Sequence, residues 1–199
     1  RRLSISGSPN LTSGLRRMYA VAQLIQQINK LRAYGIIDKP WFNALWFQLT
    51  WFSCVIGRES WLGASFALIG LHFLLASAPR KELYNLTPII AVGVAVDALL
   101  SAVGVFDFGS TLIPMWLIVL WIAFATTITR AFAFFEQRPL MAAGVGALGV
   151  PFNYAIGAKL GAVNLPLEPM FTAGVLICVW GLLFPSLFRI AAHRKSGAC

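Results

Sequence analysis

Six long apolar stretches constrain the fold of this chain more than any other feature of its sequence. Each approaches the roughly 20 residues that an α-helix needs to cross the hydrocarbon core of a bilayer. They cover residues 41–57, 61–78, 86–106, 112–135, 139–158 and 168–190. The stretches lack the ten-residue alternation of barrel strands, and helices satisfy their own backbone hydrogen bonds in lipid. The sequence therefore predicts an all-α membrane protein with six transmembrane helices.

The composition supports this prediction and excludes several classes of protein. Hydrophobic residues make up 58% and charged residues 12% of the 199 residues, whereas soluble domains have roughly 45–50% apolar and about 25% charged residues. A chain with so little charge cannot cover a soluble surface of this size. A soluble enzyme, a disordered chain and a disulfide-stapled secreted domain are therefore excluded.

Basic residues are placed unevenly around the apolar stretches, in a chain whose formal net charge is +9. With the N-terminus inside, the cytoplasmic segments hold 14 of the 16 lysine and arginine residues, and the other side holds only Arg58 and Lys159. This excess follows the positive-inside rule and predicts six spans with both termini in the cytoplasm. The basic residues form no stripe with interleaved aromatic residues, so we expect contact with membrane lipids and no binding of nucleic acid.

The sequence divides the chain into four parts. Residues 1–17 are polar and are expected to be disordered, or to be a processing or start-site remnant ahead of Met18. Residues 18–38 are expected to form an amphipathic helix in the membrane interface, the alternative being an ordinary helix packed on a partner. Its apolar residues recur at helical spacing: Val21, Leu24, Ile25, Ile28 and Leu31. The six-helix domain then covers residues 39–192, and a cytoplasmic tail covers 193–199.

The residue patterns of metal, cofactor and catalytic sites have no valid match in the sequence. Three cysteines and two histidines form no ligand cluster. Cys54 and Cys178 lie within apolar stretches, where a free cysteine behaves as a small hydrophobic residue. Phosphate-binding loops and nucleophile elbows have no suitable context in this chain. We therefore expect no metal, no cofactor, no catalytic residue and a protein that is not an enzyme.

Asp97 is the strongest candidate for a functional residue, because it lies midway along the stretch 86–106. A carboxyl group near the bilayer centre is costly unless it is paired, hydrated or protonated. His72 and Gln48 are expected at a similar depth, so the three side chains predict one polar intramembrane site for a ligand or a proton. The alternatives are a purely structural Asp97 and a His72 that only hydrogen-bonds a neighbouring helix.

A second polar cluster is expected at the outer face of the membrane. Its candidate members are Arg58, Glu59, Asp107, Asn153, Tyr154 and Lys159. Gly157 and Gly161 form a Gly-x-x-x-Gly step, which permits close helix packing. Arg130 is expected to extend its side chain to the headgroups, and the alternatives are an anionic ligand or Asp97. Three tryptophans near the ends of stretches are expected to be interfacial anchors: Trp41, Trp61 and Trp116.

Several motifs follow one another in fixed order over residues 41–190. They are Asn43-Ala-Leu-Trp-Phe-Gln48, Leu71-His72, Arg80-Lys81-Glu82-Leu83, Asp97-Ala-Leu-Leu, Pro114-Met-Trp116 and Tyr154-x-x-Gly157-Ala-Lys159-Leu-Gly161. In these motifs the chain resembles a bacterial family catalogued as domain of unknown function 2878 (DUF2878). The resemblance implies a multi-pass protein of the bacterial inner membrane with no established activity, and gene neighbourhoods that hold fatty-acid-modifying enzymes. The chain departs from the family pattern at Arg58-Glu59 and at Thr129-Arg130.

Three functions remain open at this point. The first is a non-enzymatic membrane protein that binds or moves a lipid-like or small amphiphilic molecule through a polar intramembrane site. The second is an accessory or structural subunit packed into a larger membrane complex. The third is a membrane-embedded lipid enzyme, or a partner of a lipid-modifying enzyme. We favour the first, because it accounts for the polar residues that the sequence places within apolar stretches.

Overall fold

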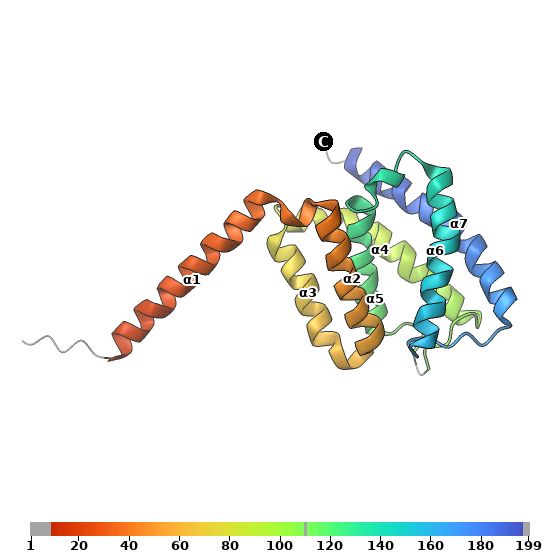
Figure 1. The fold of residues 1–199 in the computed structure, drawn as a ribbon, viewed down its shortest axis with the longest axis horizontal. Coiled ribbons are helices and arrows are strands. Elements are labelled where there is room, and N and C mark those ends of the chain that lie inside the picture. Colours follow the sequence, from red (N-terminus) through yellow and green to blue (C-terminus); the bar gives the residue numbers. More distant parts are fainter. Residues whose placement is uncertain (1–8, 110, 197–199) are drawn as a thin grey trace, which may run out of the picture.

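A computed structural model describes residues 9–109 and 111–196 as a chain of helices (Figure 1). The α-helices are α1 (Pro9–Tyr34), α2 (Pro40–Gly57), α3 (Leu62–Leu75), α4 (Pro79–Ala102), α5 (Met115–Thr129), α6 (Pro139–Lys159) and α7 (Pro169–Ser196). Short 3-10 helices lie between them: η1 (Ile36–Asp38), η2 (Arg58–Trp61) and η3 (Ala133–Phe135). Over the described residues there is no strand, and the prediction of an all-α fold is confirmed.

Helices α2 to α7 correspond to the six predicted stretches. Four segments are long and apolar enough to cross a membrane, and they are Pro40–Leu75, Pro79–Ala102, Pro139–Lys159 and Pro169–Arg194. The first of them is a hairpin of α2 and α3, because the hydroxyl oxygens of Ser53 and Ser65 lie 2.8 Å apart. Helix α5 is apolar but shorter. The six helices form one bundle.

Several of the predicted boundaries are wrong, and those at the start of α4 and the end of α5 differ by six residues or more. Helix α4 begins at Pro79 rather than near residue 86, because proline is well placed in the first turn of a helix, and charged residues there do not interrupt it. Helix α5 ends at Thr129, although the apolar stretch continues to residue 135. The hydroxyls of Thr126, Thr127 and Thr129 each donate to the carbonyl three residues earlier. Such local hydrogen bonds compete with the helical ladder, and the helix ends there.

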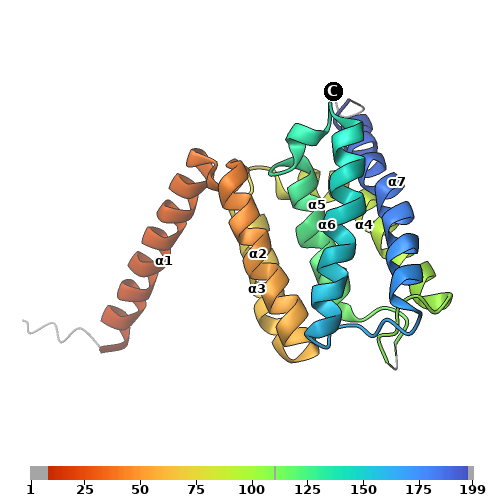
Figure 2. The ribbon, with the colours of Figure 1, turned by 45° about the vertical axis from the view of Figure 1, so that its right-hand side comes forward.

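Helix α1 leaves the bundle as a separate arm (Figures 1 and 2). It begins at Pro9, so the prediction of disorder is wrong for residues 9–17. The arm is held at its C-terminal end, where Arg32 Nε donates to the carbonyl of Leu74 over 2.6 Å. At the other end of the chain, α7 continues to Ser196, so most of the predicted tail is helical. Residues 1–8 and 197–199 lie outside the described part.

Helix α5 is the central helix of the bundle, since it contacts α2, α3, α4 and α7, whereas α6 packs mainly along α7. The helices alternate in direction, so their connections gather at two ends (Figure 1). We call the end with residues 35–39, 76–78 and 130–138 the basic end. The end with residues 58–61, 103–109 and 160–168 is the opposite end.

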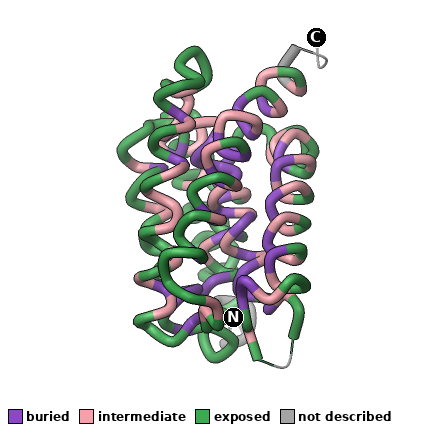
Figure 3. The backbone as a smooth tube through the Cα atoms, turned by 90° about the vertical axis from the view of Figure 1, so that its right-hand side faces the viewer, coloured by how far each residue is buried: buried purple, intermediate pink, exposed green. Residues whose placement is uncertain are grey.

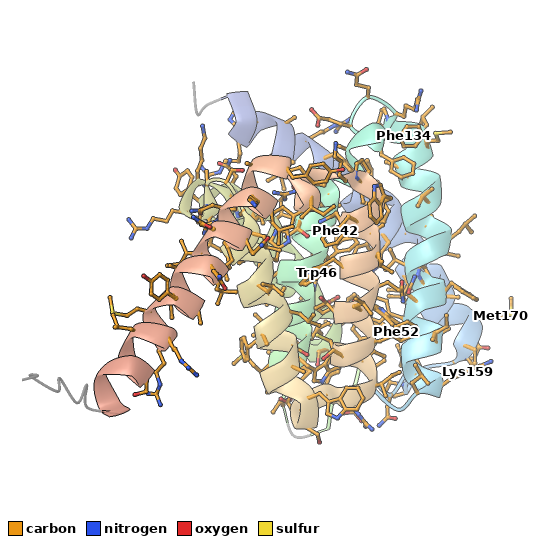
Figure 4. The ribbon with its side chains drawn as sticks, turned by 60° about the vertical axis from the view of Figure 1, so that its left-hand side comes forward. Phe42, Trp46, Phe52, Phe134, Lys159 and Met170 are labelled. Atoms are coloured by element: carbon orange, nitrogen blue, oxygen red, sulfur yellow. The ribbon has the colours of Figure 1, made fainter. Side chains whose placement is uncertain are left out.

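Exposed residues lie along the outside of the bundle (Figure 3), and many of them are large apolar residues. Leu140 is 88% exposed, Met170 82% and Leu182 75%, and Met170 projects outward in Figure 4. Polar side chains are buried instead: Asn43, Thr50, Ser53, Ser65, His72, Asp97, Thr126, Thr127 and Thr172. Water disfavours so large an apolar surface, whereas lipid accommodates it. This distribution suggests a multi-pass membrane protein.

The tryptophans and glycines only partly follow the sequence predictions. Trp41 and Trp61 are exposed near helix ends, but Trp116 is only 5% exposed and is a core residue rather than an anchor. The Gly-x-x-x-Gly contact is not formed. A Cβ atom at Gly157 would lie 3.9 Å from Val163, and Gly161 lies beyond α6 with a φ of 73° that favours glycine.

Candidate functional site

A cavity of about 200 Å³ lies between α2, α5, α6 and α7. Its lining is almost wholly apolar and rich in aromatic rings. The aromatic lining residues are Phe47, Trp51, Phe108, Trp116, Trp121, Phe124, Phe132, Tyr154, Trp180 and Phe184. Helix α6 packs closely on α7 but makes no comparable contact with α2. The cavity is therefore bounded by α2 and α6, which are separated from each other. We take this aromatic cavity as the candidate functional site.

Each wall of the aromatic cavity comes from residues spaced four apart on a helix. Such residues lie above one another on the same face. The wall from α2 consists of Phe47, Trp51 and Val55, and the wall from α6 includes Val145, Gly149, Asn153 and Gly157. Gly149 leaves the space open, because a Cβ atom there would meet no atom within 4 Å.

Asp97 does not line the aromatic cavity itself, but it hydrogen-bonds two of the aromatic side chains that do. The side chain is fully buried, and its two carboxyl oxygens accept hydrogen bonds from different helices. Trp121 Nε1 of α5 donates to Oδ2 over 2.7 Å, and the Tyr154 hydroxyl of α6 donates to Oδ1 over 2.7 Å. Asp97 therefore fixes the orientation of two aromatic side chains that line the cavity.

Stacking holds the same rings from the other side. The Trp121 and Trp180 rings are parallel to within 7°, with centroids 5.6 Å apart, and Tyr154 stacks on Phe106 at 4.5 Å. Gly93, one helical turn before Asp97, makes room for the Trp121 ring, because a Cβ atom at Gly93 would overlap it. The walls of the cavity are thus rigid before any ligand binds.

The three residues of the predicted intramembrane site are not brought together. Gln48 is exposed on α2. His72 is buried in the last turn of α3, where its Nε2 lies 2.7 Å from Glu82 Oε1. His72 lies in the last turn of α3, at the basic end, whereas Asp97 lies near the end of α4, toward the opposite end. Neither His72 nor Gln48 lines the aromatic cavity.

Arg130 completes a charged cluster with His72, Glu82 and Asp38, which we call the Arg130 cluster. Its Nη1 and Nη2 donate to the two carboxylate oxygens of Glu82 over 2.8 and 2.9 Å, and its Nε donates to Asp38 Oδ1 over 2.9 Å. The Arg130 side chain is 13% exposed. The expectation that it extends to the headgroups is therefore wrong, and it does not reach Asp97 either. The cluster joins η1, α3, α4 and the end of α5.

The electrostatics of Arg130 follow from these contacts. Burial lowers the pKa of its guanidinium, but the hydrogen bonds and charge of Glu82, followed by those of Asp38, outweigh burial and raise the pKa above its ordinary value. The guanidinium thus remains charged, and a bidentate pair with a carboxylate is among the stronger hydrogen-bonded contacts in proteins.

The predicted outer-face cluster is only partly assembled, at the opposite end of the bundle. Arg58 Nη1 donates to the carbonyl of Gly161 over 2.8 Å. Lys159 and Glu59 are exposed, and Figure 4 shows Lys159 at the end of α6. Asn153 lines the aromatic cavity and donates to the carbonyl of Gly149, whereas Tyr154 points to Asp97.

Asp107 also stands apart from the predicted cluster. It pairs through its backbone with Asn164, and its Oδ1 accepts from the Gly109 amide over 2.8 Å. The segments that follow α4 and α6 are thereby joined beneath the cavity.

The comparisons with known proteins identify a family and nothing finer. The family model described as "Protein of unknown function (DUF2878)" matches residues 40–186, which include the whole of helices α2 to α6 and most of α7. The resemblance inferred from the motifs is therefore confirmed. No curated protein and no solved structure matches the chain.

Proposed function

The chain belongs to the DUF2878 family, and we propose that it is a multi-pass membrane protein that binds or moves a lipid-like or small amphiphilic molecule in the aromatic cavity. The observation that carries this proposal is the cavity itself, bounded by aromatic rings that are held in place without a ligand. The role is one of binding or transfer rather than catalysis. The protein lies in the bacterial inner membrane with the basic end in the cytoplasm.

The size and lining of the cavity support an apolar ligand. At about 200 Å³ it exceeds the roughly 150 Å³ engineered cavity that binds benzene. An aromatic ring or part of an alkyl chain therefore fits. Aromatic walls that are already fixed reduce the entropy lost on binding, which increases affinity without additional contacts.

The position of the cavity supports uptake from the membrane. Its bounding helices α2 and α6 have exposed apolar residues on their outer faces, such as Phe52 at 46% and Phe152 at 66% (Figure 4 labels Phe52). A ligand dissolved in the bilayer meets apolar surface on its way between these helices. A water-soluble ligand would have to cross the same apolar surface unaided.

Filling the cavity tests the proposal. Gly149→Leu places a side chain in the open space of the cavity, and Gly144→Leu is the matched control, since it lies on the same helix, is exposed and also has no atom near its added Cβ. The purified protein in lipid nanodiscs is photolabelled with a diazirine-bearing hexadecanol, and the labelled peptides are identified by mass spectrometry. Labelling of the peptides with Trp51 and Trp121 is expected in the parent chain.

In Gly149→Leu we expect the labelling of the peptides with Trp51 and Trp121 to fall about tenfold. A tenfold loss corresponds to a steric clash that costs about 1.4 kcal/mol. Gly144→Leu should label as the parent does. Equal labelling of the cavity peptides in both variants, or labelling confined to the outer faces, would overturn the proposed function.

A further inference from the structure

Arg58 stands at the edge of the aromatic cavity. It follows the cavity residue Val55 by three positions, and its Nη1 donates to the carbonyl of Gly161, which directly precedes the cavity residue Ala162. The guanidinium therefore bridges the end of α2 and the segment after α6. This is the side on which the cavity meets the opposite end of the bundle.

The backbone of Arg58 adopts a costly conformation to reach this position. With φ 46° and ψ −132°, it is the one non-glycine residue with positive φ among the residues that the structure describes. Strain of this kind occurs often at ligand sites. A glycine would adopt this backbone conformation without strain. The contacts of the charged side chain at this position therefore offset the strain.

Arg58 has hydrogen-bonding capacity to spare. A guanidinium has five N–H groups, and the described contacts of Arg58 use one of them, for Gly161. Among the described residues, no ion pair joins Arg58 to an acidic side chain. Glu59 is exposed, Asp107 accepts from the Gly109 amide, and Glu168 accepts from the Phe171 amide. Arg58 thus lies beside an apolar cavity with N–H groups that no described acidic residue occupies.

We infer that the ligand of the aromatic cavity is an anionic amphiphile, whose oxyanion headgroup binds the Arg58 guanidinium while its apolar part enters the cavity. This inference rests on the proposed function and adds the class of headgroup. A guanidinium presents two parallel N–H groups that match a carboxylate or a phosphate. Lys159, the other basic residue at this end, lies two residues before Gly161, whose carbonyl accepts from Arg58. The headgroup then lies at the membrane surface, where it stays hydrated.

Two ligands with the same chain test the headgroup. Oleate and oleyl alcohol have the same chain length and double bond and differ in the headgroup, a carboxylate in one and a neutral hydroxyl in the other. Each is used to displace the diazirine-bearing hexadecanol from the purified protein. We expect the parent chain to bind oleate about tenfold more tightly than oleyl alcohol. Oleoyl lysophosphatidate, as a third competitor, shows whether a carboxylate or a phosphate is preferred, and a preference for either over the alcohol supports the inference.

Variants then assign the preference to Arg58. Arg58→Gln should abolish the preference for oleate over oleyl alcohol, and Arg58→Lys should retain part of it. Lys81→Gln removes the same charge from an exposed site at the basic end and should change nothing. The comparison of oleate with the alcohol on the parent chain needs no variant, so a poorly folded Arg58→Gln does not obscure the answer.

The outcomes separate the two proposals. Equal affinity of the parent chain for oleate and oleyl alcohol overturns the inference about the headgroup and leaves the proposed function standing. A preference for oleate that survives in Arg58→Gln overturns the assignment to Arg58. If no competitor displaces the probe, or if displacement is the same in Gly149→Leu, the proposed function fails and the inference fails with it.

Discussion

At the scale of single residues, Asp97 acts on the aromatic cavity through the rings that it holds. Its carboxyl group accepts from Trp121 and Tyr154 but does not itself line the cavity. A buried donor that loses its acceptor costs about 1–3 kcal/mol. Asp97 is therefore a positioning residue, and its two carboxyl oxygens matter more for this role than its charge.

Asp97→Leu should lower the free energy of unfolding of the detergent-solubilised protein by about 2–6 kcal/mol, because it leaves two buried donors unpaired. Asp97→Asn should lower it far less. Its oxygen can accept from Trp121, and its NH2 group can donate to the Tyr154 oxygen. Tyr154→Phe removes one donor and should cost about 1 kcal/mol. If Asp97→Asn is as damaging as Asp97→Leu in unfolding monitored by near-UV circular dichroism, the charge itself is required and the positioning role is insufficient.

At the scale of helices, α4 and α5 meet through the notch at Gly93. The Trp121 ring occupies the space that any side chain at position 93 would need. Position 93 and Asp97 are one turn apart on the same face of α4, so the notch and the hydrogen bond fix the same ring. The contact between the two helices thus sets one wall of the cavity.

Gly93→Leu should destabilise the protein by about 1–3 kcal/mol or prevent its folding, since overpacked cores lose about this much. Gly70→Leu on α3 is the matched control, because Gly70 is exposed and its added Cβ would meet nothing within 4 Å. The measurement is the thermal midpoint of the purified variants. Trp121→Ala in the Gly93→Leu background should recover part of the loss. Similar midpoints for the Gly93 and Gly70 variants would contradict the notch.

The helices themselves could be predicted from the sequence, but the cavity could not. A membrane span has to be apolar along its whole length, so the stretches reveal where helices lie. The same requirement removes the contrast between inward and outward faces. Phe47 and Trp51 line the cavity, whereas Phe52 is exposed, and the three residues are alike in type.

The depth of a residue along its span, counted from the sequence, also failed to predict which residues form the site. His72 and Asp97 are separated because His72 lies in the last turn of α3, whereas α4 begins before its apolar stretch and carries Asp97 near its other end. Rotation about the helix axis turned Gln48 outward, and counting residues from the end of a span does not reveal this rotation. Gly93 was missed because a single glycine in an apolar helix has no distinct pattern until its neighbour is known.

At the scale of the whole molecule, the two ends of the bundle differ in charge. The basic end holds the Arg130 cluster together with Lys39, Arg80, Lys81 and Arg138, and the opposite end holds Arg58 and Lys159. An orientation with the basic end in the cytoplasm follows the positive-inside rule.

This orientation can be tested with a thiol reagent that does not cross membranes. Glu59→Cys should react in intact cells, because Glu59 is exposed at the opposite end, and Lys81→Cys should react only after the membrane is opened. The parent chain serves as the blank for its native cysteines. The reverse pattern would invert the orientation, and reaction at both positions in intact cells would contradict a bundle that spans the membrane.

The shortness of α3 has a consequence for the surrounding bilayer. The helix has 14 residues and therefore spans about 21 Å, whereas the hydrocarbon core of a typical membrane is about 30 Å thick. This hydrophobic mismatch is relieved when lipids beside α3 shorten their effective length or when a neighbouring protein covers that face. The energy of thinning is smaller where the membrane is already thin. We therefore expect the protein to favour thin regions of a bilayer, and we expect any neighbouring protein to cover the face formed by α3.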